Sequence, residues 1–173
     1  MGPGSSRLFV ALWPSPETRE ACASQRDAWT WTASARPTAD ADLHVTLRFI
    51  GSVPSSRIDA LAAALAIAAE PFVLRFDRVA VWRNGVAAFE PSATPAALTR
   101  LHEAIADRLA EIGFPGEDRR FRPHVTLARD ARGSVAPSEV APTEWPVERF
   151  VLVESRGGRY RPLRDYALGA IAS

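Results

Sequence analysis

The tetrapeptide His44-Val45-Thr46-Leu47 recurs as His124-Val125-Thr126-Leu127, 80 residues further along the chain. Each copy alternates polar and apolar residues, which is the pattern of a strand that buries one of its faces. Each copy also follows a predicted strand, a helix and a loop in its own half of the sequence. The two halves are therefore expected to be similar lobes, related by a pseudo-two-fold axis.

The order of the hydrophobic segments predicts an α+β fold. We expect a bilobal molecule with two pseudo-symmetric, mostly antiparallel sheets, helices outside them and a central cleft. No segment has the composition of an interdomain linker, so residues 7–173 are expected to form one bilobal domain behind a flexible tail, residues 1–6. Expected strands cover 7–13, 43–50, 71–82, 86–89, 124–128, 147–155 and 160–168; expected helices cover 15–29, 55–69 and 95–112; expected loops cover 30–42 and 131–146.

The two motifs carry the groups that suggest chemistry. Alternate side chains of a strand share a face, so His44 and Thr46 should point away from the core. His124 and Thr126 should do the same, and symmetry would bring both faces to one cleft. Cleaving a phosphodiester needs a base for the nucleophile and an acid for the leaving oxygen, and histidine serves in either role near neutral pH. Threonine hydroxyls can donate hydrogen bonds to the phosphate oxygens.

Other interpretations of these residues remain open. A single strand histidine is more often an ordinary core residue, but two of the three histidines lie in identical strings. A zinc site normally needs three or four ligands, and the motifs offer two histidines, so no metal is expected. The third histidine, His102, has no counterpart elsewhere and is expected on a helix surface.

Arg129 could bind phosphate through its planar fork of donors. Strict alternation from His124 places it on the wrong face, so it reaches the cleft only if the strand bends or ends near Ala128. The nearby run Arg119-Arg120-Phe121-Arg122 raises the local positive potential, although such runs are usually solvated. Four aromatic residues could stack on bases or could belong to the core instead. They are Phe49, Trp82, Phe121 and Tyr160.

Composition excludes several mechanisms. The net charge is +1, so attraction to a polyanion must come from local placement of charge. All 21 basic residues are arginine, which rules out a lysine–nucleotidyl intermediate and thus ATP-dependent nucleic-acid ligation. The single cysteine, Cys22, cannot form an intrachain disulfide, which suits a cytoplasmic protein. No apolar run is long enough to span a membrane.

At these residues the sequence resembles the 2H phosphoesterase superfamily, which takes its name from two HxTx motifs. The likeness is to its bacterial RNA 2′,3′-cyclic phosphodiesterase branch, also called 2′-5′ RNA ligase-like, and it covers almost the whole chain. The strings that carry the resemblance are 7–12 (RLFVAL), 43–51 (LHVTLRFIG), 121–129 (FRPHVTLAR) and 152–155 (LVES), the last followed by Arg159-Tyr160.

This resemblance implies a bilobal fold without metal or nucleotide cofactor. It implies that His44 donates a proton to the departing ribose O3′ and that His124 accepts one from water, which leaves a 2′-phosphate. Thr46, Thr126 and Arg129 match positions of the family that contact phosphate. Members can also join RNA ends without ATP by reversing the chemistry.

The expected substrate is therefore RNA, or an oligonucleotide, with a 2′,3′-cyclic phosphate end, hydrolysed in the cytoplasm by a monomer. Two alternatives stay open. A related enzyme could act on a small cyclic nucleotide, a 2′-5′ oligonucleotide or ADP-ribose cyclic phosphate, because the motifs address the phosphate and not the base. A non-catalytic RNA-binding module would not need paired acid–base groups.

Overall fold

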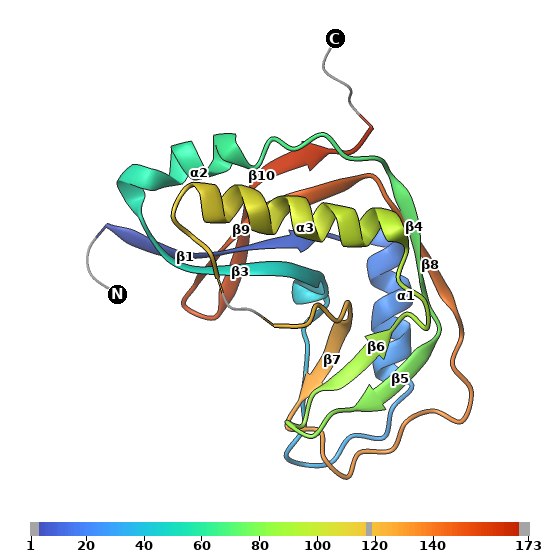
Figure 1. Ribbon diagram of the computed structural model, residues 1–173. Helices are drawn as coiled ribbons and strands as arrows, with labels where there is room; N and C mark the ends of the chain where they lie inside the picture. Colours follow the sequence, from blue (N-terminus) through green and yellow to red (C-terminus); the bar gives the residue numbers. More distant parts are fainter. Residues whose placement is uncertain (1–3, 117–118, 170–173) are drawn as a thin grey trace.

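The computed structural model describes residues 4–116 and 119–169, and its main feature is an eight-stranded sheet (Figure 1). Seven strands follow one another in the order β10-β9-β1-β3-β7-β6-β5, and β2 pairs with β7 beside them. The strand pairs are antiparallel. The strands of this sheet are β1 (Ser5–Leu12), β2 (Arg36–Pro37), β3 (Val45–Pro54), β5 (Arg78–Val81), β6 (Ala87–Glu90), β7 (Val125–Arg129), β9 (Arg149–Arg156) and β10 (Arg159–Ala167).

The two motif strands meet at the centre of this sheet. Val45 of β3 lies opposite Val125 of β7 in an antiparallel register. The two valines hold the same position in their motifs, so the pseudo-two-fold axis passes between them. The α+β, mostly antiparallel fold is confirmed, and the strands of the two expected lobes are joined at this pair into one continuous sheet.

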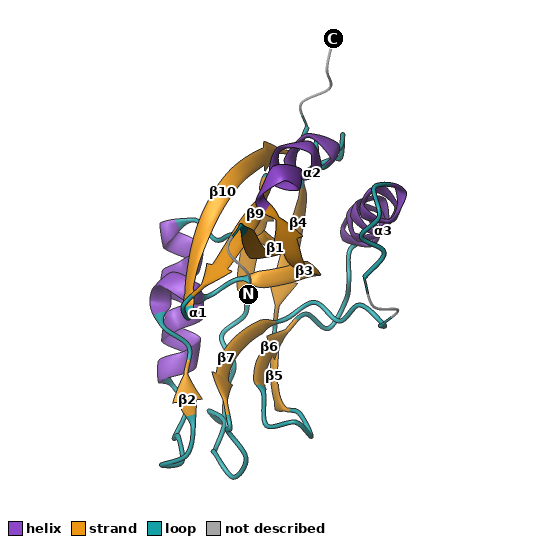
Figure 2. Ribbon diagram, turned by 90° about the vertical axis from the view of Figure 1, so that its left-hand side faces the viewer, coloured by secondary structure: helices purple, strands orange, loops and turns teal. Residues whose placement is uncertain are grey.

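Each half of the chain also covers the other half. Helix α1 (Pro16–Asp27) packs against β7 and β8 (Thr143–Val147), whereas α3 (Ala96–Glu111) packs against β3. Strand β4 (Phe72–Phe76) pairs with β8 in a second, two-stranded sheet. Figure 2 shows α1 and α3 on opposite sides of the strands, in agreement with the expectation of outer helices. The motif strands are thus fixed by elements from both halves.

Local sequence explains where the helices begin. Ser15 accepts a hydrogen bond from the Thr18 amide and caps α1, with Pro16 in the first turn. The inner face of α3 is apolar at helical spacing and fully buried. Its buried residues are Leu98, Leu101, Ile105 and Leu109.

Several expected boundaries were wrong. The helix expected at 55–69 is a 3₁₀ turn, η2 (Ser55–Arg57), followed by α2 (Ile58–Ala64). The strand expected at 71–82 is divided between β4 and β5 at Asp77, whose carboxylate accepts hydrogen bonds from the amide and hydroxyl of Ser92. The loop expected at 131–146 contains most of β8, which pairs with β4 in spite of Pro146.

The ends of β1 and β3 also differ from expectation. Strand β3 continues past Gly51, whose positive φ of 91° fits a bulge in the pairing with β1 instead of a strand end. Strand β1 already begins at Ser5, and the hydroxyl of Ser6 donates to Glu154, so the expected tail at residues 1–6 is wrong for these two residues. Residues 1–3 lie outside the described part of the chain. No described helix is long and apolar enough to cross a membrane.

Candidate active site

The two motifs expose the same residues. In each, the valine and the leucine are buried in the hydrophobic core, whereas the histidine and the threonine remain partly accessible. This is the result that strand alternation predicts. The structure therefore places His44 and Thr46 on one face at the start of β3, and His124 and Thr126 on the corresponding face at the start of β7.

Both imidazoles are held in the same way. Nδ1 of His44 lies 2.6 Å from the carbonyl oxygen of Asp42, and Nδ1 of His124 lies 2.8 Å from that of Arg122. A carbonyl oxygen can only accept, so Nδ1 of each ring carries a proton and donates it. Nε2 is then the atom that gains or loses a proton in each histidine, which is what an acid–base pair requires. Nε2 of His44 lies 2.9 Å from Oγ1 of Thr46.

Aromatic rings surround His44. The ring centroids of Phe9 and Tyr160 lie 5.2 and 5.4 Å from that of His44, and Trp13 is stacked on it at 5.5 Å. Removal from water is the main reason that the pKa of His44 is lowered to about 4. The positive charges of His124 and Arg129 lower it further, so His44 is neutral at pH 7 without substrate.

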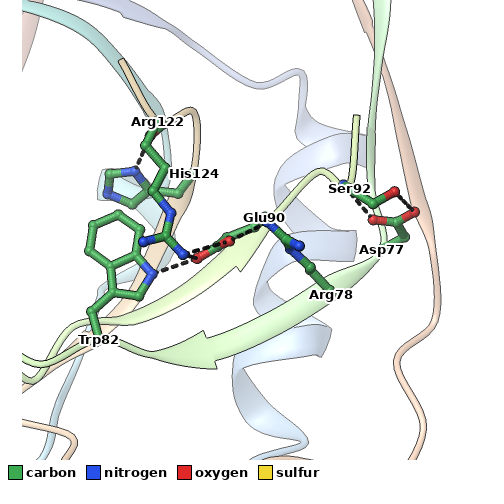
Figure 3. Close-up of polar contacts among 7 residues, drawn as sticks. All are labelled: Asp77, Arg78, Trp82, Glu90, Ser92, Arg122 and His124. Carbon is green, nitrogen blue, oxygen red and sulfur yellow. Dashed lines mark hydrogen bonds and ion pairs between the residues drawn. The ribbon is translucent and has the colours of Figure 1, made fainter. Parts of the chain in front are cut away.

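The surroundings of His124 contain charged groups. The ring centroids of His124 and Trp82 are 4.4 Å apart. The guanidinium of Arg122 lies over the Trp82 ring, 4.4 Å from its centroid. Burial lowers the pKa of His124, but the carboxylate of Glu90 acts in the opposite direction. Figure 3 shows Glu90 with Trp82 and Arg122 beside this histidine. The two motif histidines thus share a backbone arrangement and differ in their electrostatic environment.

A β-bulge explains the position of Arg129. In the pairing of β7 with β6, Thr126 faces Ala88 and Ala128 faces Ala87, so Leu127 is an extra residue. Leu127 and Ala128 are consequently both buried, and Arg129 returns to the exposed face. The charge of Arg129 lowers the pKa of both motif histidines, so it acts on both rings. Strict alternation would have placed this arginine on the opposite face.

The same bulge occurs in the first motif. Thr46 faces Ala11 of β1 and Arg48 faces Val10, which leaves Leu47 as the extra residue. Phe49 therefore holds the position in β3 that Arg129 holds in β7. Its side chain is 69% exposed, so it is a surface residue beside the first motif and not a core residue.

A cleft of about 850 Å³ opens beside the motifs. Thr46 and His124 line this cleft. His44, Thr126 and Arg129 are not among its lining residues, but Nε2 of His44 is hydrogen-bonded to the lining residue Thr46. His102, expected on the helix surface, lines the cleft as well and stacks on Phe121 at 4.0 Å. Within the described chain the lining contains no Asp or Glu. Its arginines are Arg7, Arg48, Arg119, Arg120 and Arg122, and its aromatic residues are Phe9, Phe49, Trp82, Phe121 and Tyr160.

Comparison with known proteins fits this geometry. The family profile described as "2'-5' RNA ligase superfamily" matches residues 14–159. The chain belongs to this superfamily. The match confirms the resemblance drawn from the two HxTx motifs, which both lie inside the matched range.

Named relatives of this superfamily member share most of its length. The RNA 2′,3′-cyclic phosphodiesterase of Escherichia coli is 32% identical over 94% of this chain and 96% of the relative. The protein of the same name from Thermus thermophilus is 30% identical over 94% and 90% of the two chains. The crystal structure of E. coli LigT in apo form has a TM-score of 0.82 at 30% identity and covers 95% of this chain and 98% of LigT. Further crystal structures show E. coli LigT complexed with 3′-AMP and with phosphate.

Two residues beside the motif histidines of this 2′-5′ RNA ligase superfamily member were not predicted from the sequence. Trp13 and Glu90 lie beside the two histidines, at the ends of β1 and β6. A second internal repeat could have identified them, since Val10-Ala11-Leu12-Trp13-Pro14-Ser15 matches Ala87-Ala88-Phe89-Glu90-Pro91-Ser92 in pattern. The repeat is weak because its shared residues are mainly small or apolar, and such strings are common.

Proposed function

We propose that this protein hydrolyses RNA 2′,3′-cyclic phosphate termini to 2′-phosphomonoesters by acid–base catalysis without a metal. The observation that carries the proposal is the matched pair of histidines, in each of which a backbone carbonyl fixes Nδ1 and leaves Nε2 as the atom that exchanges a proton. The names of the relatives from E. coli and T. thermophilus support the same reaction. The crystal complexes of E. coli LigT with 3′-AMP and phosphate support a nucleotide as the ligand.

In the proposed reaction, Nε2 of His124 accepts a proton from water while the water oxygen attacks phosphorus. The bond from phosphorus to O3′ breaks, and Nε2 of His44 donates its proton to this departing oxygen. Thr46, Thr126 and Arg129 hold the non-bridging oxygens, where negative charge increases in the transition state. The proton taken up by one histidine and that lost by the other balance, so a proton exchange with solvent restores the pair.

The low pKa of His44 has a consequence for this reaction. A neutral His44 cannot donate, so the bound phosphate must favour its protonated form. The cyclic phosphate carries one negative charge and would lie beside both rings. An anion at this distance raises the pKa of a histidine, which opposes the effects of burial and of Arg129. Substrate binding would thus supply the charge that prepares the donor.

The cleft favours an oligonucleotide over a mononucleotide. Its five lining arginines extend beyond the histidine pair, and they are interleaved with aromatic side chains. Guanidinium groups suit backbone phosphates and aromatic rings suit bases, so this combination is typical of single-stranded nucleic-acid sites. A 5′-hydroxyl can replace water as the nucleophile, so ATP-independent joining of a 2′,3′-cyclic phosphate end to a 5′-hydroxyl, with departure of O3′ and formation of a 2′-5′ linkage, is a further expected activity at high concentrations of RNA ends.

A turnover panel tests this function. Oligoribonucleotides ending in a 2′,3′-cyclic phosphate would be compared with small cyclic nucleotides, a 2′-5′ oligonucleotide and ADP-ribose cyclic phosphate, all in EDTA. We expect the oligoribonucleotides to have the highest kcat/KM and to yield a 2′-phosphate. Loss of activity in EDTA with recovery in Zn²⁺ or Mn²⁺ would contradict the mechanism, and preference for a small substrate would contradict the substrate class.

We also propose a cytoplasmic monomer. The one cysteine is buried, and burial raises the pKa of the Cys22 thiol to about 12, so it is protonated and unsuited to disulfide exchange. Sedimentation equilibrium tests the oligomeric state, and a mass of twice the chain mass of 18.8 kDa would refute the monomer.

A further inference from the structure

The two lobes differ at one equivalent position beside the histidines. Ala11 faces Thr46 in one lobe, and Ala88 faces Thr126 in the other, so the registers of β1 and β6 correspond. Two residues further along, Trp13 and Glu90 therefore occupy equivalent places. Trp13 is stacked directly on His44, whereas Glu90 reaches His124 through other side chains.

Glu90 is a buried carboxylate that organises its neighbours. It is 1% exposed, accepts a hydrogen bond from Nε1 of Trp82, and accepts one from Arg122 at 2.8 Å. Arg78 of β5 adds a third contact at 3.2 Å. Burial of an unpaired carboxylate would destabilise the fold, and the contacts with Trp82, Arg122 and Arg78 offset this cost. Figure 3 shows these contacts converging on the Glu90 side chain.

Two of its three partners touch His124. The ring of Trp82 contacts the imidazole at 4.4 Å, and the backbone carbonyl of Arg122 accepts the hydrogen bond from Nδ1. The Arg122 guanidinium also lies over the Trp82 ring. Glu90 therefore holds both the face of the imidazole and the segment that fixes its tautomer, without touching the histidine itself.

We propose that Glu90 is the positioning residue for His124, which it orients through Trp82 and Arg122 while supplying a negative charge that has no counterpart beside His44 among the described residues. The proposal rests on the proposed function in so far as His124 exchanges a proton during turnover. The backbone contacts of the two histidines are equivalent. Their electrostatic surroundings differ because one position of the repeated strand holds Trp13 in one lobe and Glu90 in the other.

The charges around His124 agree with this role. Glu90 on β6 favours its protonated form, whereas Arg122 before β7 and Arg129 on β7 oppose it. His44 lies close enough for the two imidazoles to repel each other when both are charged. Among the described residues, Glu90 is the negatively charged group that acts on His124, and no carboxylate side chain of this part of the chain acts on His44 in the same way.

The test is a histidine titration by nuclear magnetic resonance, which needs no substrate. The chain has three histidines, so His44, His102 and His124 can be assigned with one substitution each. We expect Glu90→Gln to lower the titration midpoint of His124 by roughly 0.3–1 pH unit and to leave that of His102 unchanged. In turnover, the same variant should lose roughly 10–100-fold in kcat, with a smaller change in KM, because the imidazole is no longer held in line.

Glu154→Gln is the matched control. Glu154 is also a buried carboxylate, 5% exposed, and it pairs with Arg161 and Ser6 in the other lobe. This variant loses the same charge at a similar depth, and we expect the His124 midpoint and kcat to remain at wild-type values. An equal shift of His124 in both variants, or no shift in Glu90→Gln, would overturn the proposal.

Trp82→Phe provides a second route if Glu90→Gln does not fold. It keeps the carboxylate and a ring beside His124 but removes the hydrogen bond that joins them. We expect kcat to fall, although less than in His124→Ala, and wild-type kcat would overturn the positioning role. If wild-type protein fails to open cyclic phosphates, the proposed function fails, while the titration still decides whether Glu90 controls His124.

Discussion

Val45 and Val125 face each other across the antiparallel junction of β3 and β7, and each is directly followed and preceded by the polar residues of its motif. Because equivalent residues pair in an antiparallel register, His44 and His124 lie on opposite sides of the valine pair, and both side chains are on the face away from the buried valines. The histidine pair of the candidate site is therefore assembled by a strand contact between the halves, and neither half contains both histidines.

The first prediction concerns this junction. Both valines are fully buried, so Val45→Ala or Val125→Ala should destabilise the fold by about 1–3 kcal/mol through lost burial and a cavity. Urea unfolding measures the change. Val73→Ala on β4 is the control, because that valine is 52% exposed and its truncation should cost less than about 0.5 kcal/mol. An equal loss of stability in the junction variants and in Val73→Ala would show that the junction is not closely packed.

The second prediction assigns the proton-transfer roles. His44→Ala and His124→Ala should each lower kcat on a cyclic phosphate by about 10²–10⁴-fold. A substrate with an activated aryl leaving group needs no proton donor, so it should restore much more activity to His44→Ala than to His124→Ala. Steady-state rates on both substrates make the comparison. Preferential rescue of His124→Ala would reverse the assignment.

The third prediction concerns pH. The kcat/KM profile reports the free protein, in which the pKa values of His44 and His124 are lowered, whereas kcat reports the complex, in which the phosphate anion raises them. Both profiles should be bell-shaped, and the optimum for kcat should lie at higher pH than that for kcat/KM. The limbs belong to the coupled pair and not to single residues. Coincident optima would mean that bound phosphate does not reach the imidazoles.

The fourth prediction concerns stability at low pH. His44 is neutral when folded, with a pKa of about 4, but titrates at the ordinary value of 6.5 when unfolded. The unfolded chain therefore binds the extra proton first, so this contribution to stability is full above pH 6.5 and is lost as pH falls toward 4. The melting temperature should decrease across that range, and less steeply in His44→Gln. An unchanged slope in this variant would place the loss elsewhere.

The fifth prediction tests the two sets of arginines. Arg129→Ala should reduce kcat/KM about 10–10³-fold by removing a donor to the phosphate, and Arg108→Ala, at a surface ion pair of α3, should not. Arg7→Ala should instead weaken the salt dependence of KM for oligonucleotides. The slope of log KM against log salt concentration should fall by about 0.7 for each phosphate contact that is lost. Wild-type rates in Arg129→Ala would return it to an ordinary surface residue, and an unchanged slope in Arg7→Ala would remove Arg7 from the phosphate path.

The order of the main strands and helices could be predicted from local pattern. Alternation identified the two motif strands because each four-residue motif alternates partly accessible and buried residues, and apolar spacing identified α3 because this helix buries one face. The break at Asp77 and the strand β8 could not be predicted in this way. Both depend on partners distant in sequence, namely Ser92 for the turn and β4 for the pairing.

The sequence by itself determined which residues are the candidates for acid–base chemistry, since a repeated His-x-Thr string at equivalent places needs no structure to suggest such a pair. The tertiary structure decided which further side chains join that pair. The bulge at Leu127 depends on the register of β7 against β6, and it turned Arg129 to the exposed face. Glu90 is separated from His124 in sequence and reaches it through Trp82 and Arg122. Register and side-chain contact arise from packing between segments, so a pattern within one segment cannot specify them.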